Sequence, residues 1–139
     1  MDTAAFLALA NRRDALRQQA KEVRDLIARE GRIVLTTEWV LAEFLNAMQR
    51  PPARTLAVQM VEQLRQSRRT KILPASTEGW QKGYDLYKSR PDKVWSLVDC
   101  ISMRICQEWS VGDVFTSDRN FEQAGYVTLM RGQRRRPTR

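Results

Sequence analysis

The sequence contains no histidine among its 139 residues. Without histidine there is no histidine general base, no Ser-His or Cys-His nucleophile, and none of the usual histidine-containing zinc sites. If the protein catalyses a reaction near neutral pH, a metal-activated water is the most economical source of a nucleophile. The sequence therefore directs attention to side chains that bind metal through oxygen.

Cysteines and long apolar runs are also scarce. The two cysteines, Cys100 and Cys106, are six residues apart on an expected helix and point to different sides, so we expect no disulfide between them. No apolar run approaches the roughly 20 residues that a membrane span needs, and we expect no signal peptide. These absences favour a cytoplasmic protein that does not enter a membrane.

Positive charge is what the chain has in excess. It carries 24 lysines and arginines against 16 aspartates and glutamates, which gives a formal net charge of +8. Its hydrophobic content of 42% and charged content of 29% are typical of a globular chain, and its length fits one domain. The excess indicates an anionic partner, nucleic acid rather than membrane, with simple solubility as the alternative.

Short β-branched runs alternate with amphipathic stretches along the chain. We expect strands at residues 33–36, 71–73, 114–116 and 126–130. The expected helices lie at 3–11 and 13–29, after the caps Thr37 and Thr77, after Pro51 and Pro52, from Ser96 to a break at Gly112, and from Phe121 to a stop at Gly125. This alternation predicts an α/β sandwich with a mainly parallel sheet, whose active crevice lies beyond the carboxyl ends of the strands.

Four acidic residues stand in apolar segments. Asp2 precedes TAAFLALA, Glu43 interrupts WVLAEFLNAM, Asp99 interrupts WSLVDCISM, and Asp118 ends DVFTSD. Acids are rarely fully buried unless they are paired or bind metal, so the pattern suggests one inward-facing cluster. Four neighbouring carboxylates cannot all stay ionised unaided, and one or two Mg²⁺ ions, which prefer oxygen ligands, would offset their charge.

Three of these acids also have plain structural explanations. Asp99 lies three residues after Ser96, as in a capping box, and Asp118 could cap the helix that follows it. Glu43 could form an ion pair with one of two arginines, Arg50 and Arg54. These alternatives remain open at the level of the sequence.

As a set, the four acids and their flanking residues resemble the PIN-domain family, in particular the small VapC-type ribonuclease toxins of prokaryotes. The resemblance runs through DTAAFLAL, TTEWVLAEFLNAM, WSLVDCIS and FTSDRNFEQAGY, and so covers nearly the whole chain. It implies a three-layer α/β/α sandwich with a mainly parallel central sheet over residues 1–130. It also implies that the four acids gather at one end of that sheet.

The function implied by this resemblance is that of an endoribonuclease that depends on Mg²⁺ or Mn²⁺. Its catalytic and metal-binding residues would be Asp2, Glu43, Asp99 and Asp118, with the Thr116 hydroxyl close by. The implied partners are an RNA substrate, the cognate antitoxin of a toxin–antitoxin pair, and a second copy of the chain in a homodimer. Two rival readings use the same residues: an inactive PIN-like module that binds RNA or protein, and a metal-dependent DNase.

The start of the sequence departs from the pattern of the family. The family has an apolar strand of about four residues in front of its first acid, whereas only Met1 stands before Asp2 here. We therefore expect a truncated first strand, and we expect the reading frame upstream of Met1 to encode further apolar residues.

The last nine residues, 131–139, form an arginine-rich segment without acids. Its five arginines carry +5 of the net charge of +8, and no apolar periodicity accompanies them, so we expect a disordered tail that tethers RNA. A tail that merely aids solubility is the alternative.

Deleting residues 132–139 tests this tether. If three or four of the arginines contact phosphates, the deletion should make the fall of log K with log salt less steep by roughly 2 to 3, at about 0.7 per contact with a single strand. RNA binding should weaken at low salt, while cleavage at saturating RNA should stay the same because the acids are untouched. An unchanged salt slope would reduce the tail to a solubility feature.

Overall fold

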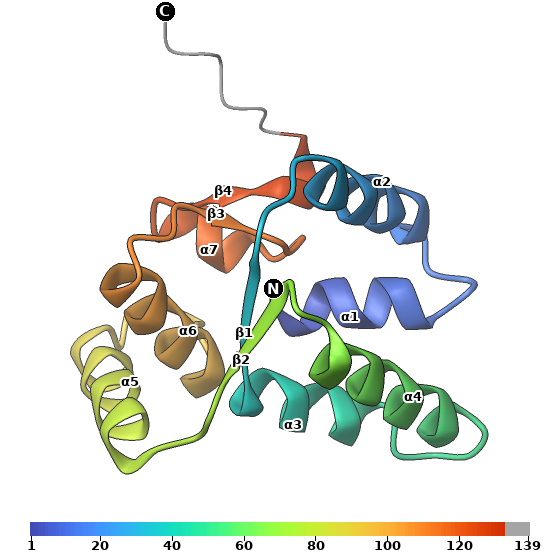
Figure 1. Ribbon diagram of the computed structural model, residues 1–139. Coiled ribbons are helices and arrows are strands. Elements are labelled where there is room, and N and C mark those ends of the chain that lie inside the picture. Colours follow the sequence, from blue (N-terminus) through green and yellow to red (C-terminus); the bar gives the residue numbers. More distant parts are fainter. Residues whose placement is uncertain (133–139) are drawn as a thin grey trace, which may run out of the picture. The chain divides into compact units, whose positions relative to one another are not determined.

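The computed structural model describes residues 1–132. The chain divides into two compact units, Met1–Pro74 and Ala75–Arg139, and each unit contains one pair of parallel strands (Figure 1). The strands are therefore parallel and alternate with helices, as the sequence predicts. None of the helices in the described range is long and apolar enough to cross a membrane. Most of the arginine-rich tail, residues 133–139, lies outside the described residues.

The first unit contains four helices and two strands. In chain order these are α1 (Thr3–Ala10), α2 (Arg17–Arg29), β1 (Val34–Thr37), α3 (Glu38–Ala47), α4 (Ala53–Gln66) and β2 (Thr70–Leu73). Strands β1 and β2 pair in parallel, from Val34 opposite Thr70 to Thr37 opposite Leu73. Both strands lie within one residue of their expected positions.

The segment in front of α1 is short, as expected, and lies alongside β1. The amino group of Met1 donates a hydrogen bond to the Leu35 carbonyl oxygen at 2.7 Å. The Thr36 hydroxyl in turn donates to the Met1 carbonyl oxygen at 2.9 Å. These two bonds fix the start of the chain, and with it the position of Asp2 within the first unit.

Helix α2 begins four residues later than the sequence suggests, at Arg17 instead of Arg13. The Asn11 side chain accepts a hydrogen bond from the Arg13 amide at 3.0 Å, and the Asp14 side chain accepts one from the Leu16 amide at 2.8 Å. Such side-chain bonds two residues ahead compete with the helical ladder, so the chain turns before the helix starts.

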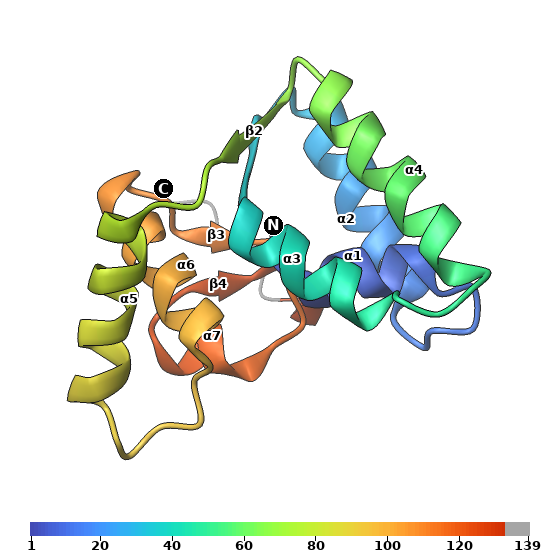
Figure 2. The ribbon, with the colours of Figure 1, turned by 90° about the horizontal axis from the view of Figure 1, so that it is seen from below.

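The core of the first unit forms where α1 meets α3. Helix α1 is apolar over most of its surface, and Phe6 packs against Phe44 of α3 with ring centroids 5.4 Å apart. The Thr37 hydroxyl accepts a hydrogen bond from the Val40 amide at 3.1 Å, which confirms it as the cap of α3. Strand β1 leads directly into α3 (Figure 2), so this cap fixes the strand-to-helix turn.

The second unit contains three α-helices, two short strands and a 3₁₀ turn. These are α5 (Thr77–Ser89), α6 (Leu97–Glu108), β3 (Asp113–Val114), α7 (Arg119–Gln123), β4 (Val127–Thr128) and η1 (Leu129–Arg131). Strands β3 and β4 pair in parallel but have only two residues each, so the longer strands expected at 114–116 and 126–130 are wrong in extent. The Thr116 amide turns back onto the Val114 carbonyl oxygen, and residues 129–131 wind into η1.

The first residue of the expected tail belongs to this fold. Arg131 lies in η1, and its Nε donates to Glu122 Oε1 at 3.0 Å. The same Glu122 oxygen accepts a hydrogen bond from the Thr128 hydroxyl at 2.9 Å. Arg131 is therefore part of the folded second unit.

Two helix boundaries in this unit differ from expectation. Ser76, and not Thr77, caps α5, with its hydroxyl accepting from the Gly79 amide at 3.0 Å. Helix α6 ends at Glu108, well before Gly112, because Ser110 adopts the left-handed conformation with φ of +52°. The Val111 amide then closes a Schellman motif on the Cys106 carbonyl oxygen at 2.8 Å. Gly125, with φ of +92°, ends α7 as predicted.

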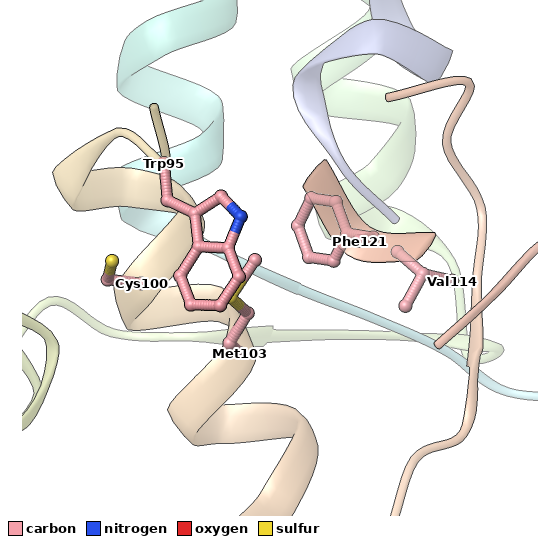
Figure 3. Packing of buried hydrophobic residues seen from close by; sticks show 5 residues of the cluster. All are labelled: Trp95, Cys100, Met103, Val114 and Phe121. Carbon is pink, nitrogen blue, oxygen red and sulfur yellow. The ribbon is translucent and has the colours of Figure 1, made fainter. Parts of the chain in front are cut away.

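The core of the second unit surrounds α6. Trp95, Cys100, Met103, Val114 and Phe121 form one buried cluster (Figure 3). Both cysteines are free, as the sequence predicts, and burial raises the pKa of the Cys100 thiol. Cys100 thus behaves as a small apolar core residue beneath the first turns of α6.

Helices α5 and α6 lie side by side and approach closely at one glycine (Figure 1). Gly83 is the one buried residue of α5. A Cβ atom at this position would lie 2.2 Å from Ile101 Cγ1 and 3.0 Å from the backbone N and Cα of Ile101. The absence of a side chain at Gly83 therefore sets the distance between the two helices.

We expect Gly83→Ala to lower the free energy of unfolding by about 1–3 kcal/mol, because overpacking outweighs the roughly 1 kcal/mol that alanine gains in helix propensity. Urea denaturation measures the change. Gly79→Ala is the matched control, since its Cβ would meet only the Ser76 hydroxyl, at 3.1 Å. A Gly83→Ala protein as stable as this control would contradict the close approach.

Candidate metal centre

Asp99 lies in the first turn of α6 and is 6% exposed. Its Oδ2 accepts a hydrogen bond from the Ser96 amide at 3.0 Å, while the Ser96 hydroxyl accepts from the Asp99 amide at 3.0 Å. This is the capping box that the sequence offered as an alternative role. The N-terminal end of the helix also favours a negative charge at this position.

Asp118 is the cap of α7, and this alternative role is also observed. Its Oδ1 accepts a hydrogen bond from the Asn120 amide at 2.9 Å. Thr116, which is fully buried, positions the backbone of Asp118, because the Thr116 hydroxyl accepts a hydrogen bond from the Asp118 amide at 3.0 Å. The hydroxyl expected close to the site therefore fixes the backbone of Asp118.

Asn120 links the two aspartates within the second unit. Its side-chain amide donates to Asp99 Oδ2 at 3.1 Å, while its backbone amide donates to Asp118 Oδ1. Asp99 and Asp118 each offer a carboxylate oxygen within 4.8 Å of the other. The sequence analysis missed Asn120, because its position two residues after Asp118 signals a turn but not a second contact 21 residues back.

The other two acids belong to the first unit. Asp2 stands at the start of α1, is 5% exposed, and makes no capping hydrogen bond with its carboxylate. Glu43 of α3 accepts a short hydrogen bond from the hydroxyl of Thr3, the residue next to Asp2. Among the residues described, the observed partner of Glu43 is thus Thr3 and not an arginine. Thr3 was a second residue that sequence reasoning did not single out.

The chemistry of these donors suits a hard divalent cation. All four candidate ligands are carboxylates, and Mg²⁺ and Mn²⁺ prefer oxygen donors. Two oxygens on opposite sides of Mg²⁺ are about 4 Å apart, and the Asp99 and Asp118 oxygens lie within 4.8 Å of each other. This pair therefore has the composition and spacing to share one ion.

Capping and metal binding are compatible on one carboxylate. The Ser96 amide and the Asn120 side chain both donate to Oδ2 of Asp99, and the Asn120 amide donates to Oδ1 of Asp118. Each capping interaction therefore uses one of the two oxygens of its aspartate. Capping the helix therefore leaves each aspartate with a second oxygen for binding metal.

Comparisons with known proteins identify the fold and the family of the chain. The crystal structure of the toxin VapC20 from Mycobacterium tuberculosis is similar, with a TM-score of 0.80 and 23% sequence identity over 91% of this chain and 94% of that one. This similarity shows a shared fold. No curated protein matches the sequence. The family model of the PIN domain matches residues 1–126, a range that includes all four acids, and the chain therefore belongs to the PIN-domain family.

Proposed function

We propose that this protein is an endoribonuclease that depends on Mg²⁺ or Mn²⁺ and acts as the toxin of a toxin–antitoxin pair. The observation that carries the proposal is the Asp99–Asp118 pair, held together by Asn120 in a chain of the PIN-domain family. PIN domains are typically metal-dependent nucleases. VapC20, which shares the fold, is described as a toxin that cleaves the sarcin-ricin loop.

In this proposal Asp2, Glu43, Asp99 and Asp118 all serve as metal ligands, directly or through water. A bound divalent cation supplies a water of lowered pKa and offsets the charge of a phosphate group. The chain contributes ligand orientation, because hydrogen bonds from neighbouring side chains and amides hold three of the carboxylates in place. These neighbours are Thr3 for Glu43, Ser96 and Asn120 for Asp99, and Asn120 for Asp118.

The charge of the chain supports RNA as the substrate. With a net charge of +8, the protein attracts a polyanion, and its acidic ligands become compatible with phosphate once cations offset their charge. A cognate antitoxin and a second copy of the chain are the protein partners that we propose, by similarity to the VapC toxins. The antitoxin would hold the nuclease inactive until it is released.

Asp99→Asn provides the direct test of the proposal. We expect the wild type to cleave RNA in Mg²⁺ or Mn²⁺, EDTA to stop cleavage, and Asp99→Asn to reduce it at least about 100-fold, since a ligand is lost. The unfolding free energy should change by less than about 1 kcal/mol, because asparagine keeps an oxygen for the Ser96 amide. Asp25→Asn, at an exposed acid of α2 paired with Arg24, is the control and should cleave normally.

The same assay distinguishes the rival functions. Metal-dependent cleavage of DNA but not RNA would identify a DNase, and RNA binding without cleavage would identify an inactive binding module. Wild-type activity in Asp99→Asn would remove this acid from the catalytic machinery and contradict the proposed site.

Metal should also stabilise the folded protein, independently of any cleavage. A ligand present at 100 times its dissociation constant adds about 2.7 kcal/mol, which corresponds to a rise of about 5–10 °C in the melting temperature of a chain of this length. Thermal scans in millimolar Mg²⁺ or Mn²⁺, against NaCl of equal ionic strength, measure the rise. Asp99→Asn should lose most of it. A wild type that melts at the same temperature in both salts would contradict metal binding.

A further inference from the structure

Helix α5 presents a row of aromatic rings to solvent. Trp80, Tyr84 and Tyr87 follow one another at spacings of four and three residues, so they share one face of the helix. All three are exposed, whereas the contact of α5 with α6 is made through Gly83. Trp80 and Tyr84 stack with centroids 5.0 Å apart and planes tilted by 15°, so each ring covers one face of the other, and an outer face of the pair is the platform on which a further ring can stack.

This aromatic row forms one wall of a groove of about 640 Å³ within the second unit. The segment between α5 and α6 also lines the groove, with Lys93, Val94, Trp95 and Ser96, and so does Leu97 at the start of α6. Val94 is 84% exposed, so the groove is apolar well beyond the core of the unit. Its volume falls within the range of about 300–1,000 Å³ that is usual for pockets that bind ligands.

Cations lie over the rings that border this groove. Lys93 Nζ is 5.7 Å from the centroid of the Trp95 ring, and Lys88 Nζ is 5.5 Å from that of Tyr84. Arg90 also covers Trp95, at 5.1 Å, but it binds both oxygens of Asp92 at 2.9 Å and holds the pKa of that carboxyl down at about 2. The Arg90–Asp92 pair is neutral overall, and Lys88 is paired with Asp85 at 3.9 Å, so Lys93 supplies the positive charge at the groove.

The groove reaches the acidic pair through Ser96. Ser96 lines the groove, and its backbone amide and hydroxyl both bond to Asp99 in the capping box. The groove therefore borders the start of α6, the helix that carries Asp99 in its first turn. The groove and the proposed metal ligands share one wall residue within a single unit.

We propose that this groove binds unpaired nucleotides of an RNA strand, with bases stacked on Trp80, Tyr84 and Tyr87 and the backbone close to Lys93. The inference rests on the proposed function and adds to it a binding groove, next to the start of α6, for the bases of the strand. Aromatic rings with adjacent cations are the combination that binds single strands, because every base has a face to stack and every phosphate has a charge. A base-paired strand keeps its faces within the duplex, so the platform selects unpaired nucleotides.

Trp80→Leu tests the stacking, with a fluorescein-labelled, unstructured ten-nucleotide RNA as the probe and fluorescence anisotropy as the measurement. The titration is done in EDTA, so binding is read without cleavage and independently of the metal ligands. Trp80→Leu should weaken binding by about 5- to 150-fold, the range for loss of one stacked base, and Trp80→Phe, which restores a ring, should recover most of it. Lys93→Gln should weaken binding and make the fall of log K with log salt less steep by about 0.7, the value for one phosphate contact.

Trp109→Leu is the matched control, because Trp109 is an exposed tryptophan of the same unit that does not line the groove. Its RNA affinity should equal that of the wild type, and circular dichroism should show each variant folded. Equal affinities of Trp80→Leu, Trp80→Phe and the wild type would overturn the proposal. So would unchanged affinity together with a loss of dimer mass in light scattering, which would assign the aromatic row to contact between two copies.

The two proposals can fail separately. A wild type that binds the probe through Trp80 but cleaves no RNA in Mg²⁺ or Mn²⁺ would retain the groove and refute the nuclease. A wild type that cleaves RNA with the same efficiency as Trp80→Leu, and binds the probe equally, would retain the nuclease and refute the groove.

Discussion

Repulsion between neighbouring carboxylates is the constraint on which the arrangement of the second unit depends. Asp99 and Asp118 have oxygens within 4.8 Å of each other, and Asp99 is buried while Asp118 is half-buried, so keeping both ionised costs free energy. Three hydrogen-bond donors offset this cost: the Ser96 amide, the backbone amide of Asn120 and its side chain. The start of α6 adds its favourable dipole. These features keep two acids close together in a form that a cation can use.

The sequence predicts those parts of the fold that depend on local pattern. β1 and β2 follow from β-branched runs, and Thr37 follows from its place before an apolar helix. Prediction from the sequence fails where a helix end or a side-chain contact depends on residues distant in the chain. The residue with a left-handed backbone after α6 is Ser110 and not a glycine. The hydrogen bonds of the Schellman motif outweigh the free energy that serine loses by adopting a positive φ. Asn120 joins Asp99 only because α6 and α7 lie close together, which no local signal reports.

The four acids stand out in the sequence for a different reason. Each lies within an apolar segment or at its end, and such a position is visible in the sequence without any knowledge of the fold. What the sequence could not decide was whether capping explained Asp99 and Asp118. The structure shows both capping roles, and it also shows that each uses one oxygen of a two-oxygen group. Capping is therefore compatible with metal binding. The capping hydrogen bonds hold each carboxylate in one orientation in the folded protein, so a metal ion would not have to order it.

The aromatic row of α5 shows why a stripe at helical spacing needs the structure before it is assigned to a core. Trp80, Tyr84 and Tyr87 have the spacing of a buried face, yet all three are exposed, and the buried residue of α5 is Gly83, which lies three residues after Trp80 and four before Tyr87. A Cβ atom at Gly83 would lie 3.0 Å from the backbone N and Cα of Ile101, so α6 approaches the backbone of α5 at this residue and not its large side chains. The spacing of the rings therefore shows only that they share a helix face, whereas their exposure depends on how the neighbouring helix packs, which the sequence does not show.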